Sequence, residues 1–327
     1  MTAKSTSSGQ IKVGVYPGPT GRIIVAPLHW GIQHGYFADA DVEVVICEPE
    51  DHPWYAAGRG DIDVGLSFID YCAWPQLRSK IVAVAVHEQF YPGHGMTCLL
   101  GRTELFESGR LTGDPASAKG LRVGLLPGRG DDYLVFSGVL KQAGLGLADV
   151  SRVPVPHGGQ ARRKWLEEGS VDLIIGRRPA SVAHEVEAGH VRVWKRGDEI
   201  YPDLQARYLV ANTGFLGRSR PLLLRFLSAY LRGVRAVRAG YEEARAGDTG
   251  GIAEVARLTG EPVERLLSVK PVGYHPTGAI DLERLGLEVD ELRSAGLFPA
   301  GLPVDHVVDL SCVADTERLA RQERGGR

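Results

Sequence analysis

The sequence predicts an α/β protein of two similar lobes with a ligand cleft between them. The main observation is a pattern that occurs twice, at residues 52–71 and 161–182. Each copy has a short helix, a Gly, a β-branched residue, Asp63 or Asp172, an apolar strand and another Gly. A helix that ends at Gly and turns directly into a buried strand is an αβ unit. Two copies one small domain apart predict two lobes, and clefts between lobes hold small molecules.

Length and composition support this fold class and exclude others. The chain has 327 residues, enough for two domains with cores, and it is 43% apolar and 24% charged. Lys and Arg number 38 against 40 Asp and Glu, so the basic excess of a nucleic-acid-binding protein is missing. The four cysteines show no CxxC spacing and are interpreted as buried free thiols. We therefore expect no metal site, no cofactor and no nucleic-acid partner.

The N-terminal residues and the hydropathy pattern bear on location. The first ten residues are polar, and the apolar run at 11–15 is too short and too early for a signal peptide. No stretch approaches the ~20 apolar residues of a membrane helix. The chain as written is therefore expected to be cytoplasmic, without membrane insertion. If a signal segment has been removed, the expected location is periplasmic or otherwise extracytoplasmic.

The first lobe is predicted from strands that alternate with short helices. Such alternation indicates a mostly parallel sheet with right-handed crossovers. β-branched residues favour a strand at 42–47, and Pro75 kinks or ends the helix that precedes it. In order, we expect a strand at 11–15, a loop at 16–22, a helix at 26–35, a strand at 42–47, a helix at 54–59, a strand at 62–67, a helix at 70–78, and strands at 81–86 and 96–101.

The second lobe follows a turn-forming segment at 112–115. Apolar residues at helical spacing make 221–246 the clearest helix, and the rest of the final third is predicted to be helical until Leu310. The other expected elements are a strand at 121–126, a helix at 133–143 ended by Gly144, strands at 150–155 and 191–195, and a return strand at 208–211.

Several segments in a fixed order carry a resemblance to a known family. They are 35–37, 60–65, 119–124, 226–233, 274–281, 296–297, 303–305 and 308–309. With these segments the chain resembles the sulfonate- and thiamine-pyrimidine-type periplasmic solute-binding proteins over nearly its whole length. The resemblance implies the type II periplasmic-binding fold. The implied parts are a first lobe at 11–105, a second lobe at 106–205, completion of the first lobe at 206–313, and a polar tail at 314–327.

The resemblance also implies two classes of function. One is an ABC-transporter substrate-binding protein for a small anionic or aromatic organic acid, a sulfonate or a pyrimidine-like molecule, with an ABC permease as partner if the chain is exported. The other is a cytoplasmic enzyme on the same fold. It would be a lyase or hydrolase acting on a small aromatic acid, such as a cofactor-independent decarboxylase or a desulfinase-like lyase using His acid–base chemistry. The desulfinating branch of the family uses a Cys just after the first strand, and residues 16–20 contain none.

Candidate site residues follow the predicted strands, because open α/β sheets bind ligands at the carboxyl ends of their strands. His52 begins a helix beside an aromatic residue, and Asp51 could cap that helix. Phe68 could stack on a ligand. If the protein is an enzyme, His52 and His94 are the expected acid–base residues. The first-lobe candidates for ligand binding are Tyr16, Thr20, Arg22, His52, Phe68, His87, Tyr91 and His94. For each of them an ordinary structural role is the alternative.

The second lobe is expected to supply positive charge to the cleft. Arg129 stands at a predicted helix start, where free N–H groups favour an anion. Arg177 follows the second copy of the repeat and could form a bidentate pair with a carboxylate or sulfonate. His157 follows a strand in a glycine-rich loop. Together with Arg129, these residues predict an anion-favouring cleft.

Overall fold

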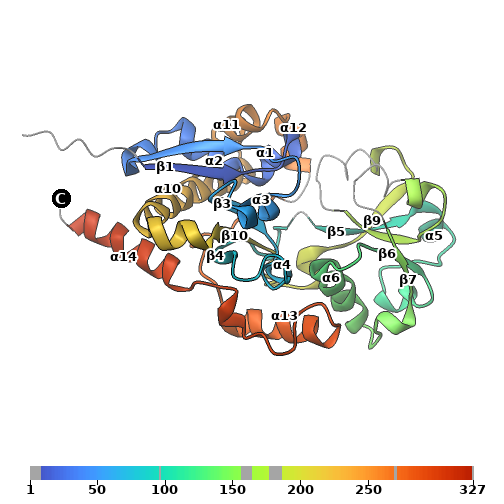
Figure 1. Cartoon of the computed structure of the whole chain (residues 1–327). Helices are drawn as coiled ribbons and strands as arrows, with labels where there is room; N and C mark the ends of the chain where they lie inside the picture. The colour runs from blue at the N-terminus through green and yellow to red at the C-terminus, as the bar shows by residue number, and fades with distance from the viewer. Residues whose placement is uncertain (1–8, 96, 156–163, 177–185, 269–270, 326–327) are drawn as a thin grey trace, which may run out of the picture.

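Two mixed sheets form the two lobes of the protein (Figure 1). The structure is a computed structural model that describes residues 9–95, 97–155, 164–176, 186–268 and 271–325. Within these ranges, the first sheet has the strand order β2-β1-β3-β10-β4 and the second has the order β7-β6-β8-β5-β9. The predicted α/β fold with two lobes is therefore confirmed.

The first sheet is parallel except for one returning strand. β1 pairs in parallel with β2 and β3, whereas β10 runs antiparallel between β3 and β4. The carboxyl ends of β1 to β4 and the beginning of β10 therefore lie at one edge. The strands are β1 (Gly9–Gly14), β2 (Val42–Cys47), β3 (Val64–Ser67), β4 (Ile81–Glu88) and β10 (Arg207–Asn212). The accompanying helices are α1 (Gly18–Ile24), α2 (Ala26–Gln33), η1 (Ala38–Ala40), α3 (Pro53–Arg59), α4 (Ile69–Cys72), α10 (Thr213–Arg245), α11 (Gly250–Thr259) and α12 (Val263–Ser268).

The second sheet repeats the parallel arrangement of β1, β2 and β3. β6 pairs in parallel with β7 and β8, and β5 runs antiparallel between β8 and β9. The strands are β5 (Cys98–Arg102), β6 (Arg122–Leu125), β7 (Ser151–Pro154), β8 (Leu173–Gly176) and β9 (Val191–Arg196). The helices are α5 (Thr103–Glu107), η2 (Pro115–Ala118), α6 (Gly130–Lys141), η3 (Leu147–Asp149) and α9 (Gly197–Ile200).

The strand β5 corrects the predicted limit of the first lobe. The sequence analysis places residues 11–105 in that lobe, but β5 pairs only with strands of the second sheet. The chain thus leaves the first sheet after Glu88 and enters the second at Cys98. A short apolar run indicates a strand, but it carries no information about which sheet the strand joins.

The two aspartates of the repeat occupy equivalent positions, as predicted. The Asp63 carboxylate accepts a hydrogen bond from the Lys12 N–H at 2.8 Å, and the Asp63 N–H donates to the Lys12 carbonyl at 2.9 Å. Asp172 makes the same two bonds with Arg122, at 2.9 and 2.8 Å. In each lobe, the aspartate that directly precedes β3 or β8 is thus bonded to the neighbouring strand, β1 or β6.

We expect the replacement Asp172→Ala to lower the free energy of unfolding by ~1.5–3 kcal/mol, because it removes charged hydrogen bonds. Asp172 also accepts a bond from the Arg122 side chain at 2.6 Å and lies 3.5 Å from Arg102. Asp63→Ala should cost less, about 1 kcal/mol, because the Asp63 carboxylate accepts one backbone N–H, whereas Asp172 also bonds arginine side chains. Urea unfolding of both variants measures the difference. An equal or larger loss in Asp63→Ala would contradict this prediction.

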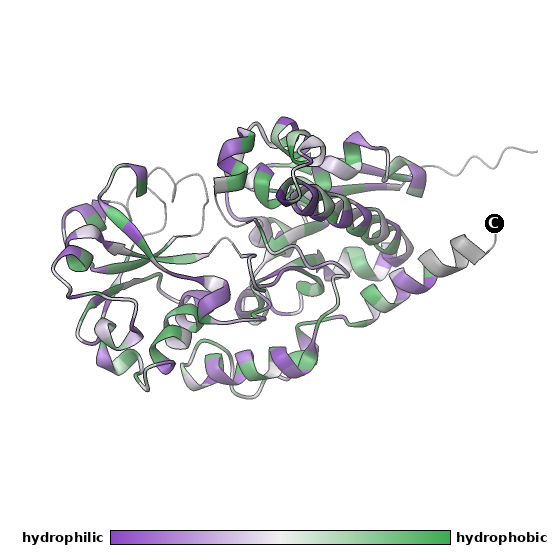
Figure 2. Cartoon of the chain, turned by 180° about the vertical axis from the view of Figure 1, so that it is seen from behind, coloured by the Kyte–Doolittle hydropathy of each residue, from purple (hydrophilic) through white to green (hydrophobic). Residues whose placement is uncertain are grey.

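The apolar core is continuous between the lobes. One cluster of buried residues contains Trp54 and Phe68 from the first lobe together with Leu134 and Phe136 from α6. A second cluster lies between the first sheet and α10, a helix along which hydrophobic and hydrophilic residues alternate (Figure 2). The predicted helix at 221–246 is confirmed. It extends back to Thr213 through a non-helical Ser219 that lies just before Pro221.

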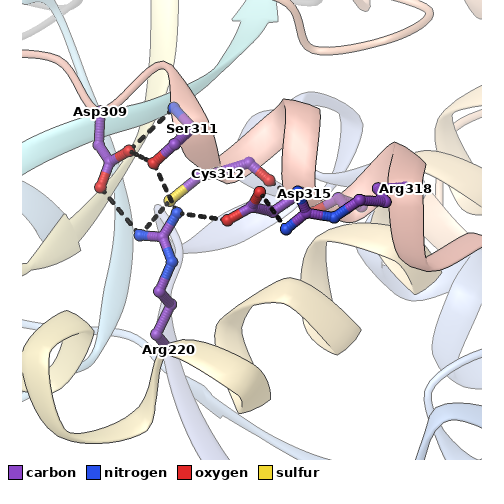
Figure 3. A network of polar contacts seen from close by, with 7 residues as sticks. Arg220, Asp309, Ser311, Cys312, Asp315 and Arg318 are labelled. Atoms are coloured by element: carbon purple, nitrogen blue, oxygen red, sulfur yellow. Dashed lines mark hydrogen bonds and ion pairs between the residues drawn. The ribbon is translucent and has the colours of Figure 1, made fainter.

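The C-terminal segment is helical where the sequence predicts a polar tail. After α13 (Leu282–Ser294) and η4 (Val304–His306), the chain forms α14 (Ser311–Gly325). Arg220 of α10 bonds the Asp309 and Asp315 carboxylates at 3.0 Å each and Ser311 Oγ at 2.6 Å (Figure 3). This network stabilises a helix whose sequence is mostly polar. A few small buried residues, among them Cys312, contribute as well. No helix in the described ranges combines the length and the apolar character needed to cross a membrane.

Candidate functional site

The residues that follow the strands of the first sheet form an aromatic cluster at the edge described above. His52 stacks on Trp54 with ring centroids 4.2 Å apart, and Trp54 lies 4.6 Å from Tyr71. Trp54, Phe68 and Tyr71 are buried. The aromatic cluster consists of Tyr16, His52, Trp54, Phe68, Tyr71 and Trp74. Of these rings, Tyr16, His52 and Trp74 are partly exposed and offer stacking faces and apolar surface to a ligand.

Two arginines from different lobes contact the ring of Phe68. The Arg129 guanidinium lies 4.6 Å from the ring centroid and that of Arg207 lies 5.3 Å from it. Arg207 is buried and pairs with the buried Glu88 at 2.9 Å. Arg129 pairs through Nε with Asp131 at 2.9 Å. Burial by itself would lower the pKa of Arg129, but Asp131, Tyr71 and Tyr16 together outweigh burial, and the pKa lies above its ordinary value.

Asp70 joins the aromatic cluster to the second lobe. Its carboxylate is buried and accepts a hydrogen bond from the Gly130 N–H, at the beginning of α6, at 3.0 Å. Burial, assisted by the nearby Asp131, raises the pKa of Asp70 to about 7. Asp70 is not among the site residues that the sequence analysis names. In the structure Phe68 is the N-cap of α4, and no side-chain cap bond is made.

Four of the predicted site residues meet here, namely Tyr16, His52, Phe68 and Arg129. Arg207 was missed. The available signal was a charged residue at the start of the otherwise apolar strand at 207–211. Asp51 does not cap α3, because His52 is the N-cap residue and Asp51 pairs with Arg59 instead.

The predicted loop at 16–22 is mostly helix. Residues 18–24 form α1, with Pro17 as the N-cap and Pro19 in the first turn, where the fixed φ of proline suits a helix. Thr20 lies within α1, but its side chain is outside the described part. Arg22 is exposed, and its guanidinium approaches Gly260 of the α11 C-cap instead of Phe68.

His87 belongs to the interior of the first lobe. It is the last residue but one of β4. Its side chain is buried, and Nδ1 lies 2.7 Å from the Tyr230 hydroxyl. Burial, with a smaller effect of Arg207, lowers the pKa of His87 to about 3. The side chain is therefore neutral at physiological pH, which makes it a poor acid–base group.

Tyr91 and His94 lie where the chain passes between the lobes. Their rings stack at 4.2 Å, Arg238 of α10 donates a hydrogen bond to the Tyr91 hydroxyl, and His94 Nδ1 lies 3.3 Å from the Pro92 carbonyl. Burial lowers the pKa of His94. Among the described residues no contact joins His94 to His52, so the two histidines proposed for catalysis have separate surroundings. His157 and Arg177 lie outside the described residues.

A cavity of about 760 Å³ lies beside this site, at the carboxyl ends of β6 and β7 and against the end of α13. Arg129 and Arg152 line it together with mostly apolar residues, among them Leu125, Tyr133 and Leu297.

Burial raises the pKa of the Cys72 thiol to about 12, so this cysteine is not a nucleophile at neutral pH. In the described ranges, no three His, Cys, Asp or Glu residues are grouped so as to hold a metal ion.

Comparisons with solved structures identify the fold. The alkanesulfonate-binding protein SsuA from Xanthomonas axonopodis pv. citri, bound to MOPS, aligns with a TM-score of 0.66 at 18% identity over 93% of this chain and 99% of that chain. The periplasmic aliphatic sulphonate-binding protein SsuA from Escherichia coli aligns with a TM-score of 0.64 at 18% identity over 92% of each chain. The desulfurization enzyme DSZB aligns with a TM-score of 0.62 at 13% identity over 95% of this chain and 99% of that chain. These likenesses confirm the type II periplasmic-binding-protein-like fold.

The sequence itself matches a family model but no curated protein. The model is described as NMT1/THI5 like and matches residues 23–244, more than half of the chain. The predicted relationship is therefore confirmed, and the protein belongs to the NMT1/THI5-like family.

Proposed function

We propose that the protein is a solute-binding protein of the ABC-import type whose two lobes hold a small aromatic organic molecule. The observation that carries this proposal is the aromatic cluster at the edge where the lobes meet, with Arg129 of the second lobe over Phe68 of the first. A ligand that contacts both groups interacts with both lobes, and its binding therefore favours their closure.

The chemistry of the residues supports a planar ligand. His52 and Trp54 are stacked almost in parallel, with an interplanar angle of 9°, and the ring of Tyr16 lies 6.3 Å from that of His52. Guanidinium groups stack on aromatic faces and bind carboxylate or sulfonate groups. The candidate ligands are therefore aromatic acids, aryl sulfonates and pyrimidine-like rings. With this function, the protein acts outside the cytoplasm and delivers its ligand to an ABC permease.

A thermal-shift screen with His52→Ala tests the proposal. A compound that binds only the folded protein raises the melting temperature, and we expect aromatic acids, sulfonates or pyrimidines to do so. Loss of one ring from the cluster should weaken binding by ~0.5–1.5 kcal/mol, or about 2- to 12-fold. His34→Ala is the matched control, because His34 is exposed and stacks on Trp30 of α2, away from the cluster. The proposal fails if no compound of these classes stabilises the protein, or if both variants bind equally well.

A further inference from the structure

A first-lobe carboxylate occupies the N-terminus of a second-lobe helix. Asp70 is 1% exposed, and its Oδ2 accepts the hydrogen bond from the Gly130 N–H. Gly130 is the first residue of α6, which is 12 residues long. The N-terminus of a helix is a natural anion site, because its N–H groups and dipole both favour negative charge. Asp70 therefore fills the place of an anionic ligand group.

The contact leaves no space for a second anion while Asp70 is in place. A Cβ atom built on Gly130 would lie 3.1 Å from Asp70 Cγ and 2.7 Å from Leu292 Cδ2. The cavity of about 760 Å³ nevertheless reaches this point, since its lining includes Leu126 to Arg129, which directly precede α6. An anion could thus approach the helix N-terminus from the cavity if Asp70 moved away.

Local charge also opposes an additional anion. Asp131 and Asp132 follow Gly130 in the first turn of α6 and are both buried. With Asp70 they place three carboxyl groups near a single guanidinium, that of Arg129, which pairs with Asp131 at 2.9 Å and lies 3.9 Å from Asp132. Because like charges repel strongly where solvent is excluded, a ligand carboxylate or sulfonate is disfavoured at this position.

We propose that Asp70 is a specificity-determining latch, which bonds the first lobe to the start of α6 and excludes anionic ligand groups from that helix N-terminus. The exclusion rests on the proposed solute-binding function, whereas the bond between the lobes does not. A ligand of the protein would then place its anionic group, if it has one, toward Arg152, which lines the cavity, and away from Gly130.

The test compares wild type with Asp70→Ala and Asp70→Asn. Amide hydrogen exchange at residues 130–133 is measured first, without any ligand. We expect Asp70→Ala to increase exchange by about tenfold or more, because the acceptor is lost, and Asp70→Asn to retain protection, because its amide carbonyl oxygen still accepts the bond. Asp61→Asn serves as the charge-matched control, since the Asp61 side chain is exposed and bonds only Arg59 among the contacts described. Unchanged exchange in Asp70→Ala would disprove the latch.

Inorganic sulfate is the probe for the exclusion. At ionic strength matched with chloride, sulfate should raise the melting temperature of Asp70→Ala and should bind this variant about tenfold more tightly than wild type or Asp70→Asn, whose amide still occupies the space beside Gly130. Equal sulfate binding by all four proteins would overturn the exclusion. Neither measurement uses the natural ligand, so a failed compound screen combined with faster exchange in Asp70→Ala would refute the proposed function and leave the latch standing.

Discussion

Replacing Arg207 by Met is expected to lower the free energy of unfolding by about 3–5 kcal/mol. Arg207 and Glu88 have side chains that are 6% and 1% exposed, and they form an ion pair at 2.9 Å. The variant retains much of the side-chain volume but leaves the Glu88 carboxylate buried without its cation. That unpaired charge dominates the cost. The lost contact with Phe68, now 5.3 Å from the guanidinium, adds to it.

Urea unfolding measures this loss, and two further variants identify its cause. The double variant Glu88→Gln with Arg207→Met should recover part of the stability, because the buried charge is then gone. Arg59→Met breaks the exposed pairs with Asp51 and Asp61 and should cost far less, because solvent screens exposed ion pairs. A small loss in Arg207→Met, similar to that of Arg59→Met, would contradict the prediction.

The second expected result concerns the dependence of stability on pH at Asp70. The pKa of Asp70 is raised from 3.8 to about 7. The folded protein therefore keeps a proton that the unfolded chain releases, and wild-type stability falls as the pH rises between these values. Asp70→Asn lacks this decline. Relative to wild type, the variant should gain up to ~4 kcal/mol between the two ends of that window.

The groups around Asp70 act in both directions on its pKa. Burial raises the pKa most and Asp131 raises it further, whereas the Gly130 N–H and Arg129 lower it. Burial also raises the pKa of Glu288 to about 8, but Glu288 titrates in both proteins and cancels in their difference. Urea unfolding of wild type and Asp70→Asn at about pH 4 and pH 8 measures the change. A stability difference that does not vary with pH would show that Asp70 is ionised throughout this window.

Local patterns were sufficient to predict much of the fold. The glycine that ends a helix, the aspartate and the apolar strand recur in both lobes, and Asp63 and Asp172 make the same bonds to Lys12 and Arg122. The long helix α10 follows from apolar residues at helical spacing. These elements were predictable because their signals lie within a few consecutive residues.

Elements that depend on distant partners were not predictable in the same way. β5 is an apolar run like β4, yet it pairs with strands that lie about 75 to 100 residues later in the chain. The C-terminal helix α14 is mostly polar and is held by Arg220, which bonds Asp315 across 95 residues of sequence. Tertiary contacts decide such elements because they outweigh local preference.

The sequence by itself determined the two-lobed class, the family and the placement of Tyr16, His52, Phe68 and Arg129 at strand ends. Only the tertiary structure decided which polar groups are buried together. Asp70 and Gly130 are 60 residues apart in sequence and meet between the lobes. His87 was predicted to line the site, but it is buried against Tyr230, 143 residues away. The pKa of a group depends on its burial and on the charges around it, and both arise only when distant segments pack.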